Sequence, residues 1–208
     1  MSFNKRIDVN SINITEGEHR LPHWTCDYAI YHVSFRLVDA VPKSVQEQWR
    51  LKRLAIIANA KTYSRSLTVE EVLQLNKLNG QVIEQYLESG YGSCHLGKPN
   101  VAIVVADTLK HFDEKRYILH AWCIMPNHIH IIVEPKLGFA LSNIIHSWKS
   151  FTANIINKEM NSRGQFWQKD AYTHIIRSEK EYHFQVDYTW KNPDKAGLKD
   201  WQWRWKCT

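Results

Sequence analysis

The sequence lacks several features that mark secreted, membrane-spanning and repetitive proteins. Its four cysteines form no Cys-x-x-Cys pair, which argues against a zinc knuckle or a thioredoxin-like site and suits reduced thiols in a cytoplasmic protein. The first residues contain no apolar signal core, and no run approaches the roughly 18 apolar residues needed to span a bilayer. No repeat or low-complexity tract is present. We therefore expect a cytoplasmic protein without membrane contact.

The composition is that of an ordinary globular protein with a basic excess. Its 208 residues, 44% of them hydrophobic and 23% charged, are enough for one domain with a sizeable core. The net charge is +6, and the isoelectric point is about 9.1. A positive excess favours a polyanionic partner such as nucleic acid, although many basic proteins bind none.

Hydrophobic periodicity indicates one mixed domain over residues 1–208. Residues 1–22 are polar and predict an amino-terminal arm, and residues 42–97 predict a helical insertion whose role the pattern does not reveal. The remaining order of strands and helices predicts an α+β fold, a ferredoxin-like antiparallel sheet with helices on one side. Strands are expected over residues 29–38, 117–124, 128–133 and 171–177, and helices over residues 100–111, 141–160 and from Ser178 to Asn192.

Two histidines stand two positions apart in the most apolar strand. His128 and His130 must share one face of that strand, because side chains alternate, while Ile129 and Ile131 point to the other face. Two histidines in this pattern are often no more than hydrogen-bonded side chains. In a strongly apolar strand, however, a polar residue costs free energy unless it is used. Two neutral imidazoles on one face can bind a divalent cation.

The helix after Ser178 carries a second set of candidate residues. Tyr188 and Asn192 are four apart and share one helix face. A tyrosine hydroxyl can attack a phosphodiester and form a covalent phosphotyrosine, but its pKa near 10 means that it needs a nearby cation or base. Asn192 can supply an oxygen ligand to a metal held by His128 and His130. Tyr182 lies on the same helix, and spacing alone does not choose between the two tyrosines.

Three segments resemble one family of proteins. The phrase from His120 to His130, including Met125-Pro126-Asn127-His128, resembles that of the REP-associated tyrosine transposases, which are single-tyrosine HUH transposases related to insertion-sequence enzymes. The segment Asp187-Tyr188 followed by Asn192-Pro193 resembles a second motif of this family, with Thr189 in place of its isoleucine. Phe166-Trp167-Gln168 is similar to a third. The resemblance covers about residues 20–41 and 98–200.

The resemblance implies both an activity and roles for particular residues. It implies the HUH nuclease fold and a DNA transposase that acts as an endonuclease, cleaving and rejoining single-stranded DNA near hairpins through a 5′-phosphotyrosine and a free 3′-OH. Tyr188 maps to the nucleophile. His128, His130 and Asn192 map to the ligands of Mg²⁺ or Mn²⁺. His183 is a weaker alternative ligand.

The candidate DNA contacts are more general. Lys149 is expected on the wet face of its helix, Arg36 on the face of the first strand that also carries His32, and Trp167 and Gln168 in the family's loop. The Trp-rich tail at 201–206 is interpreted either as a clamp for single-stranded nucleic acid or as a terminal strand. Two rival functions stay open, a domesticated DNA- or RNA-binding module without cleavage activity and a metallohydrolase that activates water. Whether the protein is a monomer or a homodimer is open too.

Overall fold

The computed structural model describes residues 13–15, 23–25, 29–71, 74–75 and 81–207. The chain divides into two compact units, one of residues 1–38 with 95–208 and one of residues 39–94. The bounds of the second unit differ by only a few residues from those of the insertion expected over 42–97. Most of the expected amino-terminal arm, residues 1–12 and 16–22, lies outside the described residues. Cys94, Cys123 and Cys207 are free thiols, and Cys26 lies outside the described part.

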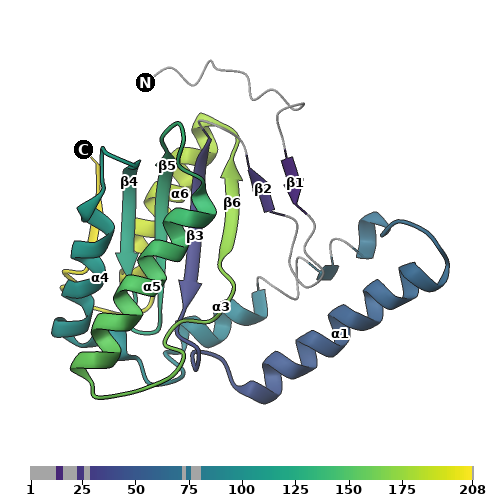
Figure 1. Cartoon of the computed structure of the whole chain (residues 1–208), viewed down its shortest axis with the longest axis horizontal. Helices are drawn as coiled ribbons and strands as arrows, with labels where there is room; N and C mark the ends of the chain where they lie inside the picture. The colour runs from purple at the N-terminus through teal and green to yellow at the C-terminus, as the bar shows by residue number, and fades with distance from the viewer. Residues whose placement is uncertain (1–12, 16–22, 26–28, 72–73, 76–80, 208) are drawn as a thin grey trace. The chain divides into compact units, whose positions relative to one another are not determined.

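The first unit is built on a five-stranded antiparallel sheet, whose strand order is β6-β3-β5-β4-β7 (Figure 1). Without β7, this order is that of a ferredoxin-like sheet with one helix after the first strand and one after the third. The expected α+β fold with an antiparallel sheet is therefore confirmed. The strands are β3 (Ile30–Arg36), β4 (Tyr117–Ile124), β5 (His128–Pro135), β6 (Tyr172–Ile176) and β7 (Arg204–Lys206).

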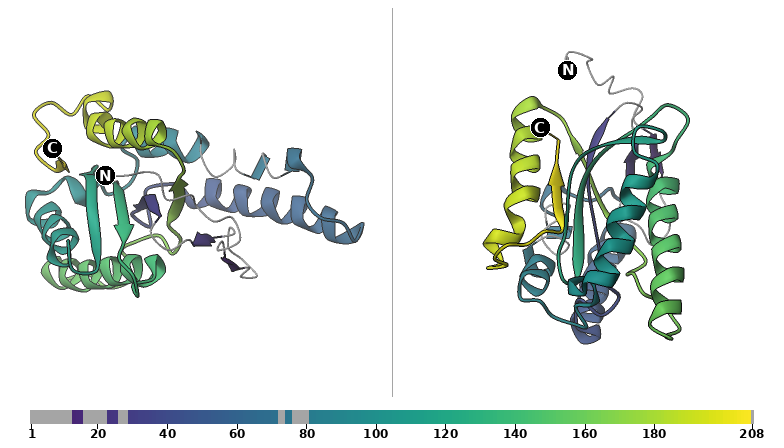
Figure 2. Two further views of the ribbon diagram at one scale, coloured as in Figure 1. Left: turned by 90° about the horizontal axis from the view of Figure 1, so that it is seen from above. Right: turned by 90° about the vertical axis from the view of Figure 1, so that its left-hand side faces the viewer.

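Helices cover both faces of this sheet. The two crossover helices, α4 (Pro99–His111) and α5 (Leu141–Glu159), lie on one face, as the ferredoxin-like plan expects. Helix α6 (Glu179–Lys195) lies against the opposite face (Figure 2, right), so the expectation of helices on one side of the sheet is wrong for this helix. The reason is that β5 is buried on both faces, so its second face also needs a cover. Val186 of α6 packs there against Ala121, Ile132 and Ile176.

The ends of α6 follow from its sequence. Ser178 is the N-cap, and its Oγ accepts a hydrogen bond from the Glu181 backbone N–H at 3.2 Å. Glu179 and Glu181 lie in the first turn, where carboxylates suit the helix dipole. Pro193 falls in the last turn, and the helix ends two residues later at Lys195. This cap fixes the start of the helix that carries Tyr188 and Asn192.

The carboxyl-terminal segment adds an edge strand. Strand β7 pairs with β4 through Trp205 opposite Trp122, and the Ile124 backbone N–H donates to the Trp203 carbonyl at 2.9 Å. The guanidinium of Arg204 lies over the Trp190 ring, with its central carbon 4.6 Å from the ring centroid. The Trp-rich tail is thus a terminal strand packed on the body, the second of the two interpretations from the sequence.

The remaining elements are small. Strands β1 (Asn13–Thr15) and β2 (His23–Thr25) form a separate antiparallel pair in the first unit, which also holds a short 3-10 turn, η2 (His95–Gly97). The second unit contains α1 (Lys43–Thr62) and α3 (Gln81–Glu88). Within the expected helical insertion, residues 69–71, 74–75 and 81–88 are helical, and residues 72–73 and 76–80 lie outside the described part.

In the second unit, a hydrogen bond joins Asp39 at its start to Ser93 near its end. The Asp39 carboxylate accepts this bond from the Ser93 backbone N–H at 2.7 Å. Gly92 has a φ of +97°, and a Cβ at this position would lie 2.7 Å from the Asp39 carbonyl oxygen. Only glycine fits both the positive φ and this close approach.

Candidate active site

His128 and His130 lie together on the sheet face that α6 covers. Both are buried, and their Nε2 atoms are 3.1 Å apart. Two cis ligands of an octahedral ion, each about 2.1 Å from it, lie about 3 Å apart, so this separation fits a shared divalent cation. Among the described residues, no group of three or more His, Cys, Asp or Glu side chains could hold a metal ion. A third ligand would therefore have to come from another residue type or from the substrate.

The other nitrogen of each ring is engaged as well. His128 Nδ1 is 2.7 Å from Asn127 Oδ1, and His130 Nδ1 is 3.0 Å from Nε2 of His32 on β3. Burial, and after it the positive charge of Arg36, lowers the pKa of His128 to about 3. Burial, and after it His128, lowers the pKa of His130 well below the usual range. Both rings are therefore neutral at physiological pH, which is the state that binds metals.

Tyr188 lies beside this pair. Its ring centroid is 5.6 Å from that of His130 and 6.2 Å from that of His32, and both contacts are edge-on. Lys195, two turns further along α6, places its Nζ 4.7 Å from the Tyr188 ring centroid. Asn192 is buried on the same helix, one turn after Tyr188. The structure thus brings Tyr188 to the histidine pair, and the roles of these residues as nucleophile and ligands stay predictions.

Arg36 supplies a cation next to the histidines. It stands directly opposite His128 in the β3–β5 register. Its Nε is buried and has no hydrogen-bond partner in the described part of the chain. Burial lowers the pKa of Arg36 while Asp170 raises it, and an arginine stays protonated through such a shift. A buried guanidinium N–H without a partner is suited to an anion such as a phosphate.

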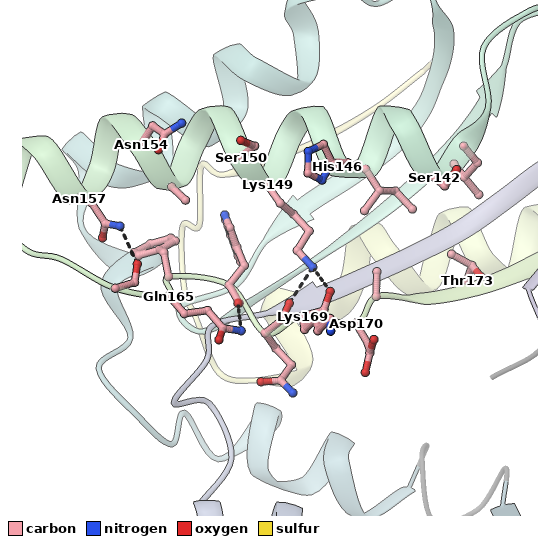
Figure 3. Close-up of a pocket in the computed structure, with 18 residues that line it drawn as sticks. Ser142, His146, Lys149, Ser150, Asn154, Asn157, Gln165, Lys169, Asp170 and Thr173 are labelled. Atoms are coloured by element: carbon pink, nitrogen blue, oxygen red, sulfur yellow. Dashed lines mark hydrogen bonds between the residues drawn. The ribbon is translucent and has the colours of Figure 1, made fainter. Parts of the chain in front are cut away.

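Lys149 lies on α5, and Trp167 and Gln168 lie in the loop that follows this helix. Each of the three makes hydrogen bonds within the fold. The Lys149 Nζ donates to the carbonyl oxygens of Gln168 and Lys169, both at 2.7 Å (Figure 3). Burial lowers the pKa of Lys149 to about 8. The Trp167 ring is only 4% exposed and donates to Thr152 Oγ1 at 2.9 Å. Binding of DNA by these three residues stays a prediction.

A pocket of about 520 Å³ lies between α5 and the loop at 164–171 (Figure 3). The Asn157 amide donates to the Gly164 carbonyl at 3.0 Å, and the Gln165 amide donates to the Trp167 carbonyl at 2.8 Å. With the two bonds of Lys149, these contacts order the loop. The backbone N–H of Gln168 then donates to the Arg36 carbonyl at 2.8 Å and extends the sheet beyond β6. The loop therefore supports the end of β3 that carries Arg36.

Sequence reasoning missed two residues of this site. It also proposed one ligand, His183, that the structure does not bring to the site. Neither His32 nor Asn127 receives a role in the site from the sequence. His32 alternates with Ser34 and Arg36 along β3, but no local pattern gives the register that brings this face of β3 against His130. His183, the weaker alternative ligand, is exposed and lies 3.8 Å from Glu179 on α6. The structure therefore gives it no contact with His128 or His130 among the described pairs.

Known proteins resemble this chain over its central part. The family model described as "Transposase IS200 like" matches residues 97–181, which include His128 and His130 but end before Tyr188 and Asn192. A relative from Haemophilus influenzae, named as a REP-associated tyrosine transposase, is 29% identical over 96 residues, which cover 39% of this chain and 54% of that protein. The REP-associated tyrosine transposase of Escherichia coli is 28% identical over 94 residues, or 42% of this chain and 53% of that protein.

The resemblance to REP-associated tyrosine transposases expected from the sequence is therefore confirmed. The chain spans about half the length of the curated relatives it matches. A solved structure of a REP-associated tyrosine transposase bound to a REP hairpin matches with a TM-score of 0.48 and 17% identity, covering 89% of this chain and 81% of that one. In the described residues, no helix is long and apolar enough to cross a membrane.

Proposed function

We propose that this protein is a metal-dependent tyrosine transposase, a single-strand DNA endonuclease that cleaves and rejoins DNA near hairpins. One observation carries the proposal, namely that the Tyr188 ring lies against a buried pair of neutral histidines whose Nε2 atoms converge. The similarity to transposases over residues 97–181 supports the class of reaction. The basic net charge suits a DNA substrate.

In the proposed reaction, the Tyr188 hydroxyl oxygen attacks the phosphorus of a phosphodiester. The new bond joins the tyrosine oxygen to the 5′ phosphate, and the bond to the 3′ oxygen breaks. The tyrosine loses its proton, and the leaving oxygen takes one up as a free 3′-OH. Rejoining reverses these steps with a 3′-OH as the attacking group. Arg36, opposite His128, and Lys195, beside the Tyr188 ring, are cations that can stabilise the phosphate charge that develops.

His128 and His130 would hold Mg²⁺ or Mn²⁺ through Nε2, and Asn192 would offer an oxygen from the facing helix. Such an ion, when bound, polarises the scissile phosphate and stabilises negative charge. The fit rests on the 3.1 Å separation of the two Nε2 atoms and on the burial that keeps both rings neutral. Hard cations prefer oxygen ligands, so Asn192 and phosphate oxygens complement the two nitrogens.

Exposed aromatic rings near Tyr188 offer a surface for unpaired bases. Phe184, one turn before Tyr188 on α6, is 63% exposed and stacks with the Tyr188 ring at a centroid distance of 6.4 Å. Tyr172 at the start of β6 is 47% exposed and lies edge-on to His32. Bases of single-stranded DNA stack on such rings without regard to sequence. Unpaired DNA beside a hairpin is therefore the substrate we propose.

A cleavage assay tests this function. Labelled DNA hairpins with single-stranded flanks would be incubated with Mg²⁺ or Mn²⁺ and resolved on a denaturing gel, using the wild type, Tyr188→Phe and the double variant His128→Ala/His130→Ala. We expect a label that migrates with the wild-type protein and is absent from both variants. Cleavage without an adduct that survives Tyr188→Phe would identify water as the nucleophile. Binding without cleavage in either metal would instead indicate a DNA-binding module.

A further inference from the structure

A third histidine, His32 on β3, contacts the pair formed by His128 and His130. His32 is 7% exposed, and its Nε2 lies 3.0 Å from Nδ1 of His130. On the far side of the same ring, Nε2 of His130 lies 3.1 Å from Nε2 of His128. His32 therefore contacts the nitrogen of His130 that is not shared with His128. This geometry makes His32 a neighbour of a ligand and not a third ligand at the same point.

The protons on these rings can be assigned from their partners. Asn127 Oδ1 only accepts hydrogen bonds, so the proton of neutral His128 is on Nδ1 and its Nε2 has a lone pair. His130 then has two possible arrangements. With its proton on Nε2, it donates to His128 and accepts from His32. With its proton on Nδ1, it donates to His32 and leaves Nε2 with a lone pair.

Only the second arrangement gives both Nε2 atoms lone pairs that point to a common cation. It requires an acceptor at Nε2 of His32, so the proton of His32 must then be on Nδ1. We propose that His32 is a positioning residue, which selects the metal-binding tautomer of His130 by accepting its Nδ1 proton in a hydrogen bond. This inference rests on the proposed metal site of His128 and His130.

The change between the two arrangements leaves each ring neutral. The Nε2 proton of His32 passes to Nδ1 of His130, the Nε2 proton of His130 leaves, and one proton is taken up at Nδ1 of His32. A neutral imidazole can donate or accept at the same atom, which few side chains of this shape can do.

Metal affinity and ring tautomers test this role without any activity measurement. Mn²⁺ binding would be followed by the free-ion electron paramagnetic resonance signal in full-length protein. We expect His32→Phe, which keeps a flat ring but has no acceptor, to weaken Mn²⁺ binding about tenfold, the usual cost of losing a partner of a metal ligand. His32→Gln retains an acceptor near the position of Nε2 and should bind more tightly than His32→Phe.

The matched control is His174→Phe. His174 stands opposite His32 in the β3–β6 register on the same sheet face, but its Nε2 is 2.6 Å from Glu181. Its loss should leave Mn²⁺ affinity unchanged. Proton–nitrogen correlation spectra of the histidine rings in wild-type protein with Mg²⁺ should show protons on Nδ1 of both His130 and His32. This spectrum needs no variant, so it tests the inference even if His32→Phe does not fold.

The outcomes separate the two proposals. If His128→Ala loses Mn²⁺ binding while His32→Phe binds as tightly as the wild type, the role of His32 is wrong and the metal site stands. If wild-type His32 is protonated on Nε2 with Mg²⁺ bound, His32 cannot accept from His130 and its proposed role is overturned. If His128→Ala binds Mn²⁺ like the wild type, the metal site itself is wrong and the role of His32 is overturned with it.

Discussion

Two tyrosines of helix α6 meet two histidines of the same sheet face, in different surroundings. The Tyr182 hydroxyl lies 3.0 Å from Nδ1 of His120 and 3.6 Å from the Cys207 sulfur. Nε2 of His120 is 3.4 Å from a carboxylate oxygen of Glu134. Burial, and after it Cys207, raises the pKa of Tyr182. This tyrosine is bound into the fold and is harder to ionise than a free one.

The Tyr188 ring, in contrast, lies next to the convergent Nε2 atoms, a stacked Phe184 ring and the cation of Lys195. A nucleophile needs access and a nearby positive charge, whereas a structural tyrosine needs a fixed partner. The comparison teaches that the same pair of residue types, on one helix and one sheet, can have very different surroundings. The partners of each tyrosine, and not its residue type, decide which one is suited to attack a phosphate.

The largest expected effect separates the two tyrosines by activity. Tyr188→Phe should reduce DNA cleavage by at least about a thousandfold, because it removes the attacking oxygen. Tyr182→Phe should cleave at a rate close to that of the wild type. Rates of adduct formation with a labelled hairpin measure both. Loss of cleavage in Tyr182→Phe with full activity in Tyr188→Phe would reverse the assignment.

His130 and His120 should differ in their effect on cleavage as Tyr188 and Tyr182 do. His130→Ala should abolish Mn²⁺-dependent cleavage, because it removes one of the two nitrogens that converge at 3.1 Å. His120→Ala should keep cleavage but destabilise the protein by about 1–3 kcal/mol, since it removes a buried ring and leaves its partly buried partners Tyr182 and Glu134 without it. Cleavage rates and urea unfolding curves, measured on both variants, check this. An inactive but fully stable His120→Ala protein would contradict the structural role of His120.

A smaller effect concerns stability alone. Tyr182→Phe should lower the free energy of unfolding by about 1 kcal/mol, the usual net contribution of one hydrogen bond. Tyr63→Phe is the matched control, because Tyr63 is exposed and its change should fall within about 0.5 kcal/mol of zero. Urea unfolding at neutral pH measures both variants. Equal stability of the two would show that the contact between Tyr182 and His120 contributes nothing.

The smallest effect is a pH dependence. Because the fold raises the pKa of Tyr182, its stabilising contribution is complete below the ordinary tyrosine pKa of about 10 and is lost as the pH rises further. The stability of the wild type should therefore fall more steeply above pH 10 than that of Tyr182→Phe. Urea midpoints from pH 8 to 11 test this sign. Parallel curves for the two proteins would remove Tyr182 as the cause.

Much of the fold could be predicted from the sequence because periodicity is a local signal. Alternation located β3, β5 and β6 to within one or two residues, and the three-and-four spacing located α5. Ser178 followed by two glutamates predicted the start of α6, and the cap is present. The face covered by α6 was predicted wrongly, because the pattern of one helix does not state which sheet surface it meets.

The site divides in the same way. Alternation alone determined that His128 and His130 share a face, and helical spacing determined that Tyr188 and Asn192 do too. Whether Tyr182 or Tyr188 meets the histidine pair was a question of packing, and the structure answered it by placing Tyr182 against β4 and Tyr188 against β3 and β5. Lys149 looked solvated from its helix face, yet it donates to the loop at 168–169.

The sequence by itself determined the strands, the helices, the histidine pair and the resemblance to transposases, because each depends on residues that are neighbours along the chain. Only the tertiary structure decided that His32 contacts His130, that Arg36 stands opposite His128, and that the Trp-rich tail is an edge strand. These facts depend on strand register and on the packing of distant segments. Such contacts form between residues that can be a hundred positions apart, so no local pattern reports them.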